Sequence, residues 1–211
     1  GLCGMPRAIK SDWSLDESVT RLKRIHYVLR RLHETMLARI PGEPIYELKT
    51  LYSHHAYLCA EQVTSIRSRV SEMREPPLGL DKVPDLGLES TLDELSRCPD
   101  TVPFLTGFYS VALPECLVAC ERLRMDAHPI ADAPTVRIAK LIAYELKEMC
   151  ETGRQYIDRL LPDESDTAIT DWKAHLRAYL SSCGSIDGTS PKQDVTPELW
   201  YPNAAKTYQH E

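Results

Sequence analysis

The sequence has little glycine and almost no phenylalanine, and it lacks the short motifs that identify common catalytic centres. Only 9 of its 211 residues are glycine and 2 are phenylalanine. No glycine-rich phosphate loop, G-x-S-x-G or H-E-x-x-H occurs, which excludes these signatures of nucleotide binding, serine hydrolysis and zinc proteolysis. Long segments with helical periodicity fill the middle of the chain, so we expect a mostly helical protein.

Basic runs and long apolar runs are also missing. The net charge is −6 and the pI is about 5.7, and no basic stretch with interleaved aromatic residues points to nucleic acid. No apolar run approaches the roughly 20 residues of a membrane span, and residues 1–10 lack the apolar core of a signal peptide. We therefore expect neither nucleic acid nor a membrane as a partner.

Cysteine is present in an odd number and without a C-x-x-C pair. The seven cysteines fall mostly at expected core positions of helices, which favours reduced thiols and a cytoplasmic location. Cys116 and Cys120, four residues apart on one helical face, could bind Cu(I) or Zn together with Cys59 and Cys150. Buried cysteine more often packs as a small hydrophobic residue.

Composition and periodicity predict one all-α domain. With 43% hydrophobic and 27% charged residues, the chain has the composition of a soluble globular protein with a sizeable core. We expect an N-terminal arm over residues 1–13, a helical domain over 14–183 and a tail over 184–211. The expected helices cover residues 14–40, 45–73, 91–98, 103–125 with a kink at Pro114, 133–161 and 166–182.

The segment 133–161 contains the best functional lead. Its apolar residues recur at the spacing of one helical face, and Glu145 lies inside that face between Leu141 and Met149. Glu148 lies on its flank. A carboxylate in an apolar face costs several kcal/mol unless it is paired, protonated or bound to metal, so Glu145 is a candidate functional residue.

Four long helices joined by a short turn, a long connection and another short turn would form a bundle with one crossover. Over residues 14–161 this arrangement resembles the ferritin-like superfamily, in which two helices each supply a Glu and two others each supply Glu-x-x-His. Tyr52-Ser-His-His55 has the His of that motif, with Tyr52 in place of Glu. Glu145-Leu-Lys-Glu148 has the Glu, with Glu148 in place of His. The resemblance implies a four-helix bundle in which His55 and Glu145 form part of an altered metal site.

Three functions are open on this pattern. In the first, His55, Glu145, Glu148 and His33 bind Fe, Mn or Zn in a metal-dependent oxidoreductase. In the second, Glu145 transfers protons to a small-molecule substrate, with a pKa raised by burial and with Tyr52 or His55 as its partner. In the third, His55 and Glu145 pair with each other or with arginine. The protein is then a metal-free module that binds a small molecule or another protein.

The remaining aromatic and histidine residues give weaker indications. Tyrosines at the margins of the apolar faces could cover the bundle or form a homodimer contact: Tyr27, Tyr46, Tyr57 and Tyr144. His54, His175 and His210 are expected to be exposed. Trp200–Tyr201, the bulky apolar pair of the tail, could pack on this domain or on another subunit, or could be disordered.

Overall fold

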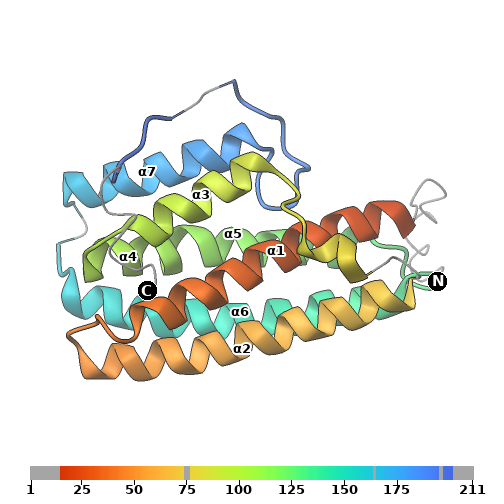
Figure 1. The fold of residues 1–211 in the computed structure, drawn as a ribbon, viewed down its shortest axis with the longest axis horizontal. Coiled ribbons are helices and arrows are strands. Elements are labelled where there is room, and N and C mark those ends of the chain that lie inside the picture. Colours follow the sequence, from red (N-terminus) through yellow and green to blue (C-terminus); the bar gives the residue numbers. More distant parts are fainter. Residues whose placement is uncertain (1–14, 74–76, 164, 195–196, 202–211) are drawn as a thin grey trace, which may run out of the picture.

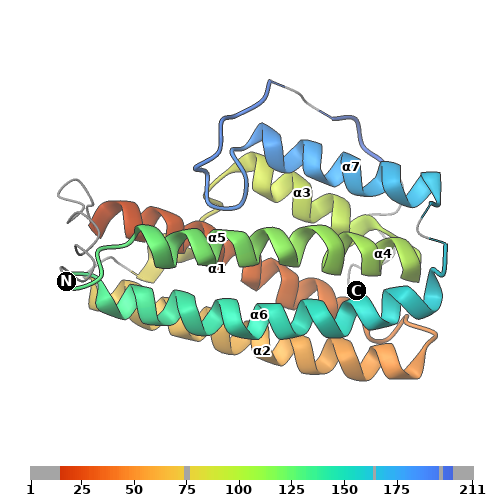
Figure 2. The same cartoon turned by 180° about the vertical axis from the view of Figure 1, so that it is seen from behind.

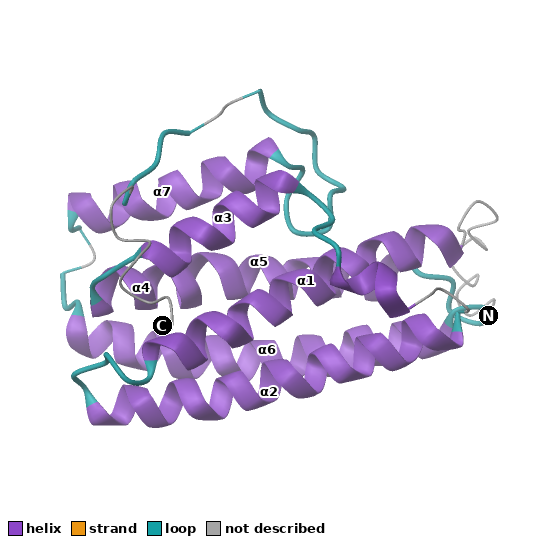
Figure 3. Ribbon diagram, viewed as in Figure 1, coloured by secondary structure: helices purple, strands orange, loops and turns teal. Residues whose placement is uncertain are grey.

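The structure, a computed structural model, describes residues 15–73, 77–163, 165–194 and 197–201. This part of the chain is all-α, as predicted, with six helices and no strand (Figure 3). One of the six is continuous through three segments: α4 (Thr101–Gly107), the π-helical turn η2 (Phe108–Ala112) and α5 (Leu113–Asp126). The others are α1 (Leu15–Arg39), α2 (Tyr46–Glu72), α3 (Leu86–Arg97), α6 (Ala133–Leu160) and α7 (Thr167–Ser182), with a short 3-10 turn, η1 (Pro77–Asp81).

The helices lie in three rows that follow the long axis of the molecule (Figures 1 and 2). The α2 and α6 helices form one outer row, α1 and the α4–α5 helix form the middle row, and α3 and α7 form the other outer row. Each short turn joins neighbours in space, α1 to α2 and α5 to α6, as expected for antiparallel helix pairs. The long connection after α2 holds η1 and α3, which packs against α7.

The helix ends follow from local capping chemistry. Asp85 precedes α3, and its side chain accepts hydrogen bonds from the backbone N–H groups of Gly87 and Leu88. Asp166 caps α7 in the same way. Because Asp85 is a good cap, α3 begins five residues before the predicted residue 91. The cap predicted at Ser14 lies outside the described residues.

Pro114 changes the helix that contains it, but by widening it instead of breaking it. The N–H of Leu113 donates to the carbonyl of Phe108, five residues back. Proline has no N–H, and its ring clashes with the carbonyl four residues earlier in a regular α-helix. The extra residue in the π-helical turn accommodates that ring. Such turns inside α-helices are frequent at functional sites.

The helix that runs from Thr101 to Asp126 passes a length and composition test for a membrane span, and 61% of its apolar window is buried inside the protein. It occupies the middle row, with neighbours on both sides (Figure 1). Packing in the core accounts for its apolar composition.

A buried ion pair joins the ends of three helices. Asp132, whose side chain is fully buried, accepts from Nη2 of Arg69 at 2.7 Å and from the hydroxyl of Ser18. Arg69 Nε donates to Thr135 Oγ1 at 3.0 Å. Both charges are therefore hydrogen-bonded, which is the condition under which a buried pair is tolerated. The cluster fixes α1, α2 and the start of α6 relative to one another.

Two described residues of the tail, Trp200 and Tyr201, pack back on the helical domain. Both lie against Trp172. The backbone N–H of Trp200 donates to the Glu94 carboxylate at 3.2 Å. His175 takes part in the same cluster, with Nε2 3.3 Å from Glu94 and a side chain that is only 11% exposed. The prediction that His175 is exposed was wrong, because periodicity along α7 does not reveal that the chain returns to cover it.

Candidate ligand-binding groove

His55, the imidazole predicted at the centre of a site, is buried and has one clear partner. Its Nδ1 lies 2.6 Å from the hydroxyl of Tyr109, which projects from η2. Burial, and then the nearby His54, lowers the pKa of His55 to about 4. At neutral pH His55 is therefore uncharged, and its partner is Tyr109, neither Glu145 nor an arginine.

The other predicted residues point to different partners. Tyr52 is fully buried and donates its hydroxyl to Glu43 at 3.1 Å, and burial raises the pKa of Tyr52 far above its usual value. Since a carbonyl only accepts, His33 donates from Nδ1 to the Ala56 carbonyl at 2.7 Å. Glu145 is half-buried and Glu148 is exposed.

These placements do not assemble a metal site. In the described ranges, no group of three or more His, Cys, Asp or Glu side chains is arranged to hold a metal ion. One ring nitrogen of His55 is already hydrogen-bonded to Tyr109, and one of His33 to a backbone carbonyl. The Glu145 charge acts instead on Cys59, where it adds to burial and raises the pKa of the thiol to about 12. The donor set therefore does not fit the predicted centre, and we derive no metal-dependent step.

The buried histidines predict a loss of stability in mild acid. His26 is also fully buried, and burial followed by the Arg67 charge lowers its pKa to about 4. Below pH 6.5 these two histidines are protonated in the unfolded chain but stay neutral in the folded protein, so acid favours unfolding. Each of the two histidines should therefore lower the free energy of unfolding by up to about 3 kcal/mol as the pH falls from 6.5 to 4.

Urea unfolding at several pH values checks this expectation. His26→Gln or His55→Gln should each flatten the pH dependence of the unfolding free energy in that window. An unchanged slope in both buried-site variants would contradict the expectation.

Tyr109 reaches its position because α6 carries a glycine opposite it. The ring of Tyr109 lies directly on Gly153, and a Cβ added at Gly153 would overlap the ring atoms. The same tyrosine lines a cavity of about 310 Å³ between η2, α6 and α7. The π-helical turn and the missing side chain thus shape one wall of this first cavity.

The lining of the first cavity is strongly basic. Arg154 comes from α6, and Lys173 and Arg177 come from α7. Within the described segments, no ion pair is formed by any of these three cations. Among the described residues, Glu151 is the one carboxylate that lines this cavity. The other lining residues are Tyr109, Ser110, Pro114 and Cys150.

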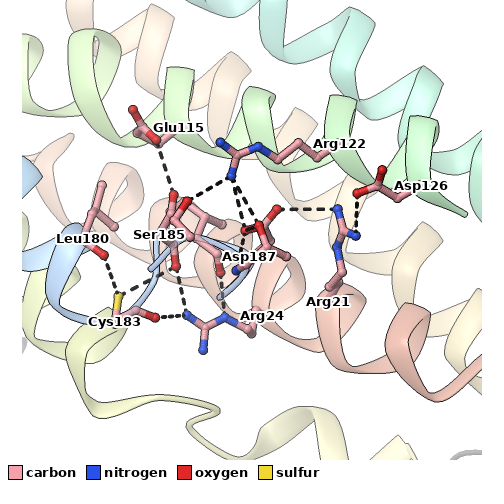
Figure 4. Close-up of polar contacts among 12 residues, drawn as sticks. Arg21, Arg24, Glu115, Arg122, Asp126, Leu180, Cys183, Ser185 and Asp187 are labelled. Carbon is pink, nitrogen blue, oxygen red and sulfur yellow. Dashed lines mark hydrogen bonds and ion pairs between the residues drawn. The ribbon is translucent and has the colours of Figure 1, made fainter. Parts of the chain in front are cut away.

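A second cavity of about 320 Å³ borders the first, and Arg177 lines both. Arg122 and Glu115 reach into it from α5, facing the loop that follows α7 (Figure 4). Its other lining residues are Leu180, Ser181, Ser185, Ser190, Pro191 and Gln193. We call the two cavities together the α7 groove; in Figure 2, α5 lies between α7 and α6.

This groove could hardly be predicted from the sequence. Arg154 and Lys173 are on different helices and belong to no basic run, so only the fold brings them together. Pro114 and Gly153 were the available local signals, since both are unusual inside long helices. Comparisons of this chain with protein-family models, with curated proteins and with solved structures each give no match.

Proposed function

We propose that this protein binds a small anionic molecule in the α7 groove. The observation that carries the proposal is the convergence of Arg154, Lys173 and Arg177 on one cavity without carboxylate partners in the described structure. The chain as a whole has a net charge of −6, so a basic cavity is not a consequence of overall composition. Repulsion among the three cations falls when an anion binds between them.

The lining is suited to a phosphate or carboxylate group. Arginine presents a planar fork of N–H donors that matches both groups, and lysine adds a mobile positive charge. The hydroxyl of Ser110, on the π-helical turn, forms no hydrogen bond with any described residue and can donate to the same ligand. The volume of the first cavity lies at the lower end of the usual range for ligand sites, about 300–1,000 Å³.

A ferritin-like, metal-dependent oxidoreductase receives less support from the same geometry. That function needs carboxylates and imidazoles that converge on one point. His55 is bonded to Tyr109, and Glu148 is exposed on the surface. The small-molecule module, which is the alternative left by the sequence, needs only the groove.

Calorimetric titration with inorganic phosphate and with citrate tests the proposal. Arg154→Ala, Lys173→Ala and Arg177→Ala should each weaken binding about tenfold, because each removes a charge-assisted hydrogen bond. The matched controls are Arg137→Ala and Lys140→Ala, which remove exposed cations of α6 away from the groove. Binding by the control variants should change less than about twofold.

Salt provides a second check on the same titrations. Affinity should fall as ionic strength rises, because the rim of the groove is open to screening ions. Equal losses in the groove variants and the control variants would show a general charge effect. That result, or no binding of either anion to the unaltered protein, would contradict the proposed function.

A further inference from the structure

We infer that the ligand of the α7 groove has one anionic group and a neutral, polyhydroxylated body, as in a sugar phosphate or a sugar acid. This inference rests on the proposed function and concerns the second cavity. Because Arg177 lines both cavities, a molecule anchored in the first extends naturally into the second. The lining of the second cavity then selects the body of the ligand.

The second cavity carries less positive charge than the first. Among the described residues, two cations (Arg122 and the shared Arg177) and one carboxylate (Glu115) line it, whereas three cations and one carboxylate line the first. Arg122 is already engaged, with Nη1 3.3 Å from Thr189 Oγ1, 3.2 Å from Ser190 Oγ and 3.7 Å from the Asp187 carboxylate (Figure 4). A second anionic group would meet Glu115 and a guanidinium that already has acceptors, so a neutral group fits better.

Uncharged polar groups dominate the rest of this cavity. Ser181, Ser185, Ser190 and Gln193 contribute hydroxyls and an amide. The side chains of Ser181 and Gln193 have no hydrogen-bond partner in the described part of the chain. Sugar hydroxyls both donate and accept, and they match hydroxyl, amide and carboxylate groups at once. No aromatic ring from the described residues lines this cavity, so a nucleobase would find no stacking partner among them.

The loop after α7, which supplies Ser185, Ser190 and Gln193, is held in place by hydrogen bonds within the protein. Arg24 of α1 donates from Nε to the Ile186 carbonyl at 2.8 Å, and from Nη2 to the carbonyls of Cys183 at 3.0 Å and Ser185 at 2.9 Å (Figure 4). Gly184 has φ +81, a conformation that favours glycine. Arg24 thus holds Ser185 directly, and the backbone N–H of Ser190 donates to the Gly184 carbonyl at 3.0 Å. Such preorganisation reduces the entropy lost on binding.

The test compares five probes by calorimetry on the unaltered protein: inorganic phosphate, glucose 6-phosphate, gluconate, glucose and adenosine monophosphate. Glucose 6-phosphate, gluconate or both should bind at least about tenfold more tightly than phosphate. Glucose alone should bind weakly, since it lacks the anchoring charge. Which of the two hydroxylated anions binds better identifies the anionic group, and either result supports the inference.

Variants of the second cavity separate the inference from the proposed function. Ser181→Ala combined with Gln193→Ala should bring the affinity for the preferred sugar anion down to that for phosphate, while phosphate binding changes less than about twofold. Ser182→Ala is the matched control, because Ser182 is the next residue on α7 but does not line this cavity.

Phosphate binding with no gain from either sugar anion would overturn the inference and leave the proposed function intact. Tighter binding of adenosine monophosphate than of both sugar anions would also overturn it. Absence of binding by every anion would overturn the proposed function itself.

Discussion

Gly153→Ala should destabilise the protein by about 2 kcal/mol, the cost of forcing a side chain into a packed core. In an exposed helix the same change stabilises by about 0.5–1 kcal/mol, because alanine loses less backbone entropy on folding. Here the added Cβ would overlap the ring of Tyr109. The steric overlap should outweigh this stabilisation, because the Tyr109 ring packs on α6 and its hydroxyl is hydrogen-bonded to His55. Urea denaturation of both proteins measures the difference.

The same substitution made in a Tyr109→Ala protein tests whether the loss of stability comes from the contact with the ring. In Tyr109→Ala the ring is absent, so Gly153→Ala should recover its ordinary helix-stabilising effect and change sign. Tyr109→Ala alone should cost about 3–5 kcal/mol as a large-to-small core substitution. If Gly153→Ala destabilises equally in both backgrounds, the contact between ring and glycine does not set the conformation of the first cavity.

Asp132→Ala should cost about 3–5 kcal/mol, because it removes the buried carboxylate partner of the Arg69 guanidinium and leaves the ion pair with the exposed Glu72 at 3.4 Å. The Ser18 hydroxyl would lose an acceptor at the same time. Asp158→Ala, which removes an exposed aspartate of α6, should change stability by less than about 0.5 kcal/mol. Thermal and urea unfolding of the two variants give the comparison.

Removing both charges should lower the free energy of unfolding by less than the two single removals added together. Arg69→Met combined with Asp132→Ala should be less destabilised than the sum of the two single variants, because no unpaired charge remains buried. Strict additivity of the two losses would show that the pair is not coupled. The buried cluster would then not hold α1, α2 and α6 together.

The helices could be predicted from the sequence almost to their ends. Apolar periodicity with Pro134 at the start gave 133–161 for a helix that spans Ala133–Leu160. The largest difference is α3, where Asp85 acts as a cap that the prediction did not use. At Pro114, where the sequence predicts a kink, the helix contains a π-helical turn, and periodicity does not say how the backbone adapts to a proline.

The candidate site was much less predictable. Periodicity places His55 and Glu145 toward the interior, but it does not reveal which neighbouring helix each one meets. The rotation of α6 leaves Glu145 half-buried, while η2 turns Tyr109 toward His55. The basic cavity depends on residues from two helices that meet only in the folded protein. Such a site depends on tertiary contacts, and these cannot be predicted from a single sequence that has no recognisable motif.

Amide chemical-shift mapping during a phosphate titration locates the bound anion. The largest shifts should fall on the backbone amides around the first cavity, at Ser110, residues 150–154 and residues 173–177. The shifts should saturate, and they should disappear in a variant that combines Arg154→Ala and Arg177→Ala. Shifts that are confined to other parts of the protein, or that spread over its whole surface without saturation, would contradict a binding site in the α7 groove.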